Sequence, residues 1–132
     1  MASTHTLEVP TSQHCELIDI TAKVAALVQA SGVQTGLCTV FCPHTTGAIT
    51  INENADPDVQ DDVLMALDRA VPNRGFKHSE GNSDAHTKAS LVGPSVTVLI
   101  DGGALKLGTW QGIYFCEFDG PRRRKAWVQI LP

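Results

Sequence analysis

Three histidines mark the positions at which this sequence could bind a metal. His44, His78 and His86 lie at the ends of expected elements or in the loop between them. Neutral imidazole is the commonest protein ligand for zinc and similar metals, and a catalytic zinc site typically has three protein ligands. Because the spacing follows no regular signature such as HExxH, two interpretations stay open: a three-histidine metal site, or hydrogen-bonded polar residues at a rim.

Carboxylate, amide and hydroxyl side chains supply further candidates for chemistry. Glu53 can act as a general base, since a carboxylate beside a metal or in a partly buried pocket can accept a proton near neutral pH. Asn54 and Asn82 can fix a ligand or satisfy loop backbone. His86 and Ser90 are one helical turn apart and therefore face the same way. We expect Ser90 to donate a hydrogen bond, in particular to phosphate, and not to act as a nucleophile.

The one basic run, Arg122 to Lys125, is local in a chain whose formal net charge is −4. This overall charge argues against a general nucleic-acid binder. The run fits a solvated turn that leads into a strand. The alternative is an anion site formed by one of the arginines, because a guanidinium grips a phosphate through two donors.

Length and composition are typical of a globular single domain. The 132 residues fit one domain, 1–132, with 42% hydrophobic and 18% charged residues. No apolar run approaches the roughly 18 residues that span a bilayer, and the N-terminus lacks a basic region followed by an apolar core. We therefore expect no membrane partner and a cytoplasmic location. The four cysteines form no CxxC pair, which favours buried free thiols in a reducing compartment.

Alternating and helical patterns predict the elements that position these candidates. Strands are expected over residues 5–10, 14–20, 36–42, 95–100, 104–110, 111–118 and 124–131, and another within PHTTGAITINENADPD, 43–58. Helices are expected over 22–31, 57–70 and 82–93. Thr21 and Asp56 are the expected N-caps of the first two helices and Asn82 or Ser83 that of the third, while Gly32 ends the first.

These elements predict an α+β fold. We expect a curved, barrel-like and mainly antiparallel sheet of about eight strands, with two longer helices and one short helix at one face. The strands group in adjacent antiparallel pairs. Segment 36–42 is apolar on both faces and should be a central strand.

The segment 43–58 separates two of the candidates. His44 and Glu53 are nine residues apart along it, which is about 30 Å if the strand is straight. They can share one small site only if the strand bends strongly or a neighbouring subunit supplies one of them.

Three long segments of mixed composition are HTTGAITINENADPDV (His44 to Val59), HSEGNSDAHTKASLVGPS (His78 to Ser95) and LGTWQGIYFCEFDGPRRR (Leu107 to Arg124). Together they resemble the YjbQ-like family, also called secondary thiamine-phosphate synthase-like. The resemblance runs over nearly the whole chain, in order and at natural spacing. The chain departs from the family pattern at Ser83 and Thr87, and neither is a candidate ligand.

The resemblance implies a compact α+β fold that assembles as a homotrimer, with sites near subunit boundaries. The activity that it implies joins a pyrimidine methyl diphosphate to a thiazole phosphate and releases pyrophosphate. The three histidines fall at the family's histidine positions. The residues that match its NEN, GTWQ and EFDGPR elements are Glu53, Asn54, Thr109, Trp110, Gln111, Glu117, Asp119 and Arg122.

The first hypothesis is a metal-dependent enzyme that acts on a small phosphorylated metabolite, with the thiamine-phosphate synthase-like activity implied by the resemblance. A divalent metal, Zn²⁺ by ligand type with Mg²⁺ or Mn²⁺ as alternatives, would be held by His44, His78 and His86. The catalytic candidates are Glu53, Asn54 and Ser90; the candidates for binding substrate or phosphate are Thr45, Asn82, Trp110, Gln111 and Arg122. The alternative is a non-catalytic metabolite-binding or trimeric assembly protein whose polar cluster is structural.

Overall fold

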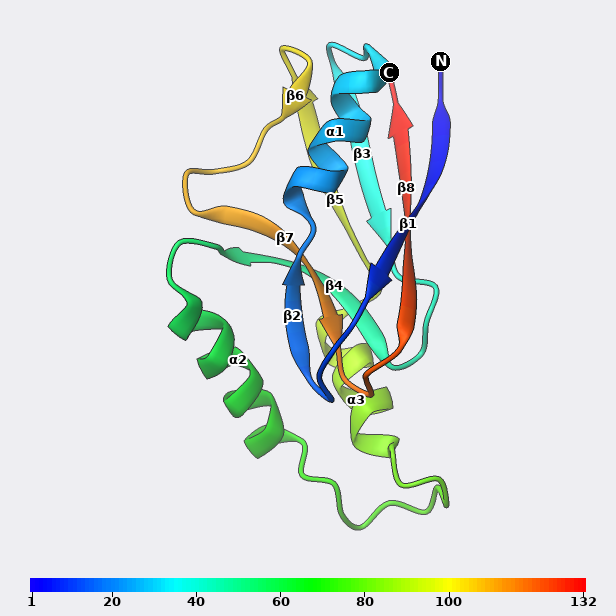
Figure 1. Ribbon diagram of the computed structural model, residues 1–132, viewed down its shortest axis with the longest axis vertical. Coiled ribbons are helices and arrows are strands. Elements are labelled where there is room, and N and C mark those ends of the chain that lie inside the picture. The colour runs from blue at the N-terminus through cyan, green and yellow to red at the C-terminus, as the bar shows by residue number, and fades with distance from the viewer.

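All of residues 1–132 are described in the computed structural model, and they form eight strands and three helices. In chain order these are β1 (Ser3–Pro10), β2 (Glu16–Asp19), α1 (Thr21–Ser31), β3 (Gly36–Phe41), β4 (Gly47–Glu53), α2 (Pro57–Ala70), α3 (Ser83–Val92), β5 (Ser95–Asp101), β6 (Ala104–Leu105), β7 (Gln111–Glu117) and β8 (Arg123–Leu131). The predicted α+β class, with curved and mainly antiparallel sheets, is confirmed (Figure 1).

The strands form two sheets. Sheet A has the order β1-β8-β3-β5-β6 and sheet B the order β2-β7-β4, and every pairing is antiparallel. The predicted central position of β3 is confirmed. The expected pairing of strands adjacent in sequence is wrong except for β5 with β6. Apolar alternation fixes which face of a strand is buried, but not which strand lies beside it.

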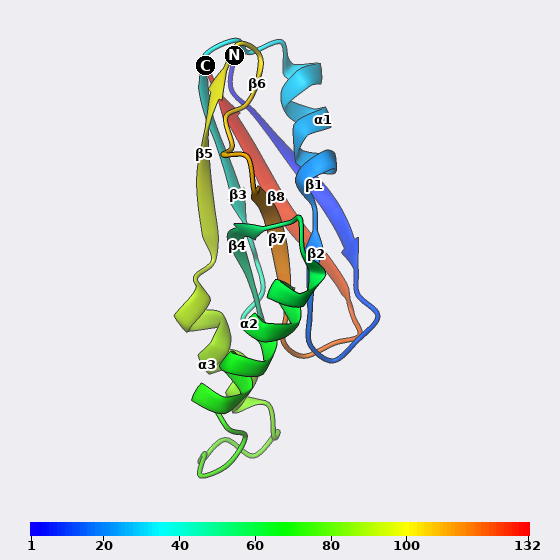
Figure 2. The same cartoon turned by 90° about the vertical axis from the view of Figure 1, so that its left-hand side faces the viewer.

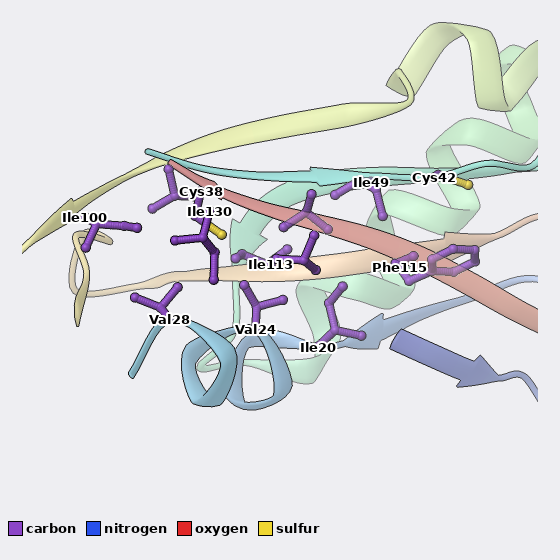
Figure 3. Packing of buried hydrophobic residues seen from close by; sticks show 14 of the residues in the cluster. Ile20, Val24, Val28, Cys38, Cys42, Ile49, Ile100, Ile113, Phe115 and Ile130 are labelled. Carbon is purple, nitrogen blue, oxygen red and sulfur yellow. The ribbon is translucent and has the colours of Figure 1, made fainter. Parts of the chain in front are cut away.

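The main core lies between the two sheets and against α1. Figure 3 shows Val24 and Val28 of α1 pointing toward Ile113 of β7 and Ile130 of β8, and all four side chains are fully buried. Burying one such aliphatic side chain contributes about 1.5–3 kcal/mol. This core fixes sheet A, sheet B and α1 relative to one another.

A smaller core lies on the other face of sheet B, beneath α3. Its buried members are Ala48, Ala85, Ala89, Cys116 and Phe118. The alanines of α3 therefore form a packed stripe on a different side of the helix from His86 and Ser90. Helix α2 adds only the half-buried Leu64 and Leu67 and contains no buried residue. Figures 1 and 2 show α2 and α3 away from the two chain termini, which lie close together at the opposite end.

Two helix ends follow the predicted residues closely. Asp56 is the N-cap of α2, and its Oδ1 accepts the N–H of Asp58 at 3.0 Å. Gly32 ends α1 with a φ of 73°, a left-handed conformation that glycine adopts without strain.

The predicted N-cap of α1 is wrong, whereas Asn82 takes the predicted N-cap position of α3. Thr21 is the first residue of α1, and Ile20 holds the N-cap position without a side-chain bond. Asp19 replaces the predicted cap, because its Oδ1 accepts the Thr21 N–H at 2.9 Å. Asn82 holds the N-cap position of α3, but its Oδ1 makes no capping bond; only its Nδ2 is engaged, as a donor to Asp119.

The predicted strand over 104–110 is mostly wrong. Only Ala104–Leu105 pairs with β5, and the following residues form a loop to β7. The side chain of Gln111 stabilises that loop, because its Oε1 accepts the Gly108 N–H at 2.8 Å. Trp110, at the end of the loop, is 62% exposed.

All four cysteines are free, as predicted, and Cys38, Cys42 and Cys116 are buried. Burial raises the pKa of Cys38 to about 11 and that of Cys116 to about 12, so both are thiols at neutral pH. No helix of the chain has the length and apolar character that crossing a membrane requires.

Candidate functional site

A hollow of about 320 Å³ brings together four candidate side chains from two distant segments. His44 and Thr45 belong to the connection from β3 to β4, and His86 and Ser90 lie one turn apart on α3. We call these four residues the His44 pocket. Gly47, Ala89 and Pro94 complete its lining. The smaller core beneath α3 explains why these two segments lie together, because the alanines of α3 pack against the start of β4.

The backbone of β8 fixes the orientation of His44. The Lys125 N–H donates to Nε2 of His44 at 2.9 Å, and the imidazole meets Phe115 edge-on with ring centroids 6.3 Å apart. Partial burial lowers the pKa of His44, and the nearby Arg124 charge lowers it further. The ring is therefore neutral at pH 7. Because Nε2 accepts a hydrogen bond, the ring proton lies on Nδ1.

A buried ion pair lies beside the connection from β3 to β4 that carries His44. Glu117 is fully buried and Arg124 is 5% exposed; Nε of Arg124 donates to Oε1 at 2.8 Å and Nη2 donates to Oε2. Arg124 Nη2 also donates to Thr46 Oγ1 at 2.7 Å, and the Thr11 hydroxyl donates to Glu117 Oε1 at 2.7 Å. Burial alone would raise the pKa of Glu117, but hydrogen bonds from Arg124, Thr11 and the Asp119 N–H hold it below its usual range.

Arg124 and Glu117 are not among the catalytic, binding or metal-ligating residues expected from the sequence, although the sequence carries a signal for both. In β8 the buried residues alternate with exposed ones, and Arg124 occupies the inward register with Ala126 and Val128. Glu117 ends an otherwise apolar strand, QGIYFCE. A charge at an inward position needs a buried partner of opposite sign. That rule would have paired these two residues.

A third group of candidates surrounds the start of α3. Nδ2 of Asn82 donates to Oδ2 of Asp119 at 2.9 Å, and Nη2 of Arg122 donates to the same oxygen at 3.0 Å. Burial alone would raise the pKa of Asp119, but these two hydrogen bonds lower it below the usual range. The Oδ1 atom of Asn82 is buried and accepts no hydrogen bond. It is therefore an unsatisfied acceptor, to which a ligand or a neighbouring group could donate a hydrogen bond.

The predicted three-histidine metal set is not assembled within one chain. The rings of His78 and His86 lie with centroids 5.7 Å apart and nearly perpendicular, and Nδ1 of His78 is 3.0 Å from the Ser83 hydroxyl. The lone pair of His44 is engaged by the Lys125 N–H. No group of three or more His, Cys, Asp or Glu side chains is arranged to hold a metal. These residues therefore do not fit a three-ligand site in a single chain, and metal binding stays a prediction.

The remaining candidates lie at the opposite end of β4. Glu53 faces Gln111 in the register between β4 and β7, and the Asn54 N–H donates to the carbonyl of Trp110 at 2.9 Å. The seven residues of β4 separate this group from the His44 pocket, a span of about 20 Å at 3.3 Å per residue. Within one chain these four residues do not join the pocket.

Residues 5–132 match the family described as UPF0047 protein YjbQ-like. The UPF0047 protein YugU of Bacillus subtilis is 50% identical over 128 residues, which cover 96% of this chain and 97% of that protein. A UPF0047 protein of Methanocaldococcus jannaschii is 50% identical over 125 residues, 94% of this chain and 91% of that protein.

Solved structures of similar proteins share the fold of this chain over nearly its whole length. A protein of the YjbQ/UPF0047 family from Clostridium acetobutylicum is 57% identical with a TM-score of 0.94, over 96% of this chain and 99% of that chain. A YbjQ-like protein of unknown function from Sulfolobus solfataricus is 34% identical with a TM-score of 0.95, over 98% and 96%. Sequence and fold thus agree over the same residues, and the chain belongs to the UPF0047 family of YjbQ-like proteins.

Proposed function

We propose that this chain is a small enzyme that acts on a phosphorylated metabolite and binds a phosphoryl group in the His44 pocket. The residues that line the pocket are the observation that supports this proposal. Two imidazoles and two hydroxyls face it, and no carboxylate does. Thr45 and Ser90 are exposed residues, so both hydroxyls can donate to a ligand. A concave site with several convergent donors suits an oxyanion.

The side chains at the start of α3 can bind the phosphoryl group of a second substrate. Asn82 and Arg122 are already oriented by Asp119. The Arg122 side chain is 54% exposed and therefore has further N–H groups free for a ligand. The two phosphorylated substrates of one reaction would then occupy the two places.

The reaction that we propose is of the thiamine-phosphate synthase type. The thiazole nitrogen forms a bond to the methylene carbon of the pyrimidine, while the carbon–oxygen bond to the diphosphate breaks and pyrophosphate leaves with the electron pair. Preorganised donors favour this step because they stabilise the charge that develops on the departing oxygen. His44 and Ser90 would contact that leaving group. The predicted divalent metal, Zn²⁺, Mg²⁺ or Mn²⁺, enters none of these steps.

We further propose that the enzyme is a homotrimer in which a neighbouring subunit completes the site. Glu53, Asn54, Trp110 and Gln111 are too far from the His44 pocket in their own chain, so a second copy would have to bring them. Trp110 suits a contact between subunits because it is a large exposed aromatic residue. A reducing compartment such as the cytoplasm would suit the four free thiols.

Replacement of Ser90 by alanine tests the proposed function. Thiamine phosphate formation from the two phosphorylated precursors should lose roughly tenfold or more in kcat/KM, because one donor to the departing diphosphate is removed. Ser95→Ala is the matched control, since Ser95 is exposed on β5 outside the pocket. Equal rates for wild type, Ser90→Ala and Ser95→Ala would overturn the role of the pocket in this reaction.

The alternative, a non-catalytic metabolite-binding or assembly protein, is favoured by one observation. Asn82, Asp119 and Arg122 satisfy one another, as a purely structural cluster would. His86→Ala and Glu53→Ala separate the two functions. If both variants keep full activity but no longer form a trimer, the structural function is correct. If both remain trimers but lose activity, the enzymatic function is correct.

A further inference from the structure

The imidazole of His44 has one fixed role, which follows from a single hydrogen bond. The backbone N–H of Lys125 points at Nε2 from 2.9 Å. A backbone amide can only donate, so Nε2 must be the nitrogen that carries the lone pair. In a neutral imidazole the proton is then on Nδ1. That N–H is the polar group of the ring left for a ligand in the His44 pocket.

Two neighbouring residues of β8 hold the connection between β3 and β4 in place. Arg124 donates to the hydroxyl and carbonyl oxygens of Thr46, at 2.7 and 3.4 Å, and the next residue, Lys125, donates to His44. Two consecutive residues of one strand thus fix positions 44 and 46 of the connection between β3 and β4. Glu117 in turn fixes Arg124. The orientation of His44 therefore rests on the buried ion pair and not on a flexible surface contact.

Protonation of the ring is opposed by the same surroundings. An imidazolium carries N–H groups on both nitrogens, so its Nε2–H would face the N–H of Lys125 without an acceptor. The Arg124 charge also disfavours a cation, and Glu117, which would favour one, is already paired with that arginine. His44 is thus kept neutral with its proton on Nδ1.

A metal ion requires the opposite arrangement. A histidine ligand offers a lone pair to the metal, and the lone pair of His44 is taken by a backbone donor. We infer that His44 is a fixed neutral donor through Nδ1–H, positioned by Lys125 and Arg124, and that it selects a phosphoryl oxygen and excludes a metal ion from its side of the pocket. This inference rests on the proposed function for the identity of the oxyanion. The tautomer itself does not depend on it.

Nitrogen NMR of the wild-type protein labelled with ¹⁵N-histidine tests the orientation without any substitution. The His44 spectrum should show a protonated Nδ1 and an unprotonated Nε2 at pH 7. Added Zn²⁺ should leave both nitrogens unchanged, whereas added inorganic phosphate should shift Nδ1. An Nε2–H tautomer, or a Zn²⁺-dependent shift of either nitrogen of His44, would overturn the inference.

Two substitutions then separate the roles of the two ring nitrogens. Asparagine places an amide group near the position of Nδ1, and glutamine places one near Nε2. His44→Asn keeps a donor toward the ligand, so it should bind inorganic phosphate about tenfold more tightly than His44→Gln, as expected for one hydrogen bond to a charged group. A metal ligand would show no such order. Equal or reversed affinities for two variants with wild-type circular dichroism contradict the inference.

Phosphate binding by the wild-type protein separates this inference from the proposed function. If phosphate fails to bind, the proposed function and the oxyanion assignment both fall. The Nδ1–H tautomer would then still show the positioning of His44 by β8. If phosphate binds and His44 is the Nε2–H tautomer, the phosphate-binding pocket is supported. The inferred role of His44 as an Nδ1–H donor is then wrong.

Discussion

At the scale of single residues, Arg124 organises the corner of the chain that carries His44 and Thr45. It is joined to Glu117 by two hydrogen bonds and to Thr46 by two more. Both charged groups are removed from water, so each depends on the other for compensation. The pair is therefore important to the fold as well as to the pocket.

Replacement of Glu117 by glutamine should lower the free energy of unfolding by about 3–5 kcal/mol, because it leaves a buried guanidinium without its counter-charge. Urea titration followed by circular dichroism measures this change. Glu8→Gln is the matched control, since Glu8 is exposed on β1, and should change stability by less than about 0.5 kcal/mol. Similar values for the two variants would contradict the importance of the pair.

The pH dependence of stability should carry the signature of two carboxylates. Hydrogen bonds overcome the effect of burial and hold the pKa values of Glu117 and Asp119 below their usual range. Their ionisation therefore stabilises the fold above the unfolded-state pKa, about 4, and this stabilisation is lost as the pH falls through the folded-state pKa. Urea titrations of wild type and Asp119→Asn between about pH 3 and 6 should show the steeper decline in the wild type. Parallel curves would be the contrary result.

At the scale of elements, α2 is joined to α3 by an ion pair and to sheet B by the hydrogen bond of Gln60 with Tyr114. It has no buried residue of its own, while Lys88 of α3, only 2% exposed, contacts Asp68 of α2 and lies 3.9 Å from Asp84. One buried ammonium group therefore links the two helices. We expect α2 to be the least protected of the three helices.

Replacement of Lys88 by methionine should release α2 selectively. Amide hydrogen exchange in α2 should become about tenfold faster, which corresponds to about 1.4 kcal/mol of local opening, while β7 keeps its protection. Lys106→Met removes an exposed ion pair with Asp101 and is the matched control. A uniform increase in exchange across α2 and β7 would show that Lys88 stabilises the whole fold instead.

Local sequence signals predicted the elements well and their neighbours poorly. Asp56 and Pro57 start α2 as expected, because capping and the fixed φ of proline act within a few residues. The pairing of β1 with β8 joins the two ends of the chain, and no local pattern encodes it. The site shows the same limit. The sequence placed His86 and Ser90 together on one helix, but the lone pair of His44 is engaged by a residue 81 positions away.

At the scale of the whole molecule, the outer face of sheet A is unusually apolar for a surface. Its large exposed side chains are Leu37, Phe41, Leu99, Trp127 and Leu131, and Phe41 and Trp127 stack with ring centroids 5.9 Å apart. Grouped apolar residues on a strand surface favour association. A hollow lined by Phe41, Trp127 and His44 also connects this face with the His44 pocket. A partner on sheet A would therefore lie next to the site.

Replacement of Trp127 by glutamate should dissociate the proposed trimer into folded monomers, because it places a charge in the centre of this face. Sedimentation velocity measures the mass, and circular dichroism confirms the fold. Met65→Glu introduces the same charge on exposed α2 and should leave the assembly intact. A trimeric Trp127→Glu protein, or dissociation by Met65→Glu alone, would assign the subunit contact to another surface.

Binding of a phosphoryl group in the His44 pocket can be tested by a titration with inorganic phosphate. Backbone amide NMR of the whole chain with increasing inorganic phosphate distinguishes this pocket from the basic hollow lined by Glu8, Arg123 and Lys125. We predict saturable shifts at Thr45, His86 and Ser90, with none at Glu8 or Arg123. Shifts confined to the basic hollow, or no saturable shifts at all, would show that the His44 pocket does not bind the phosphoryl group.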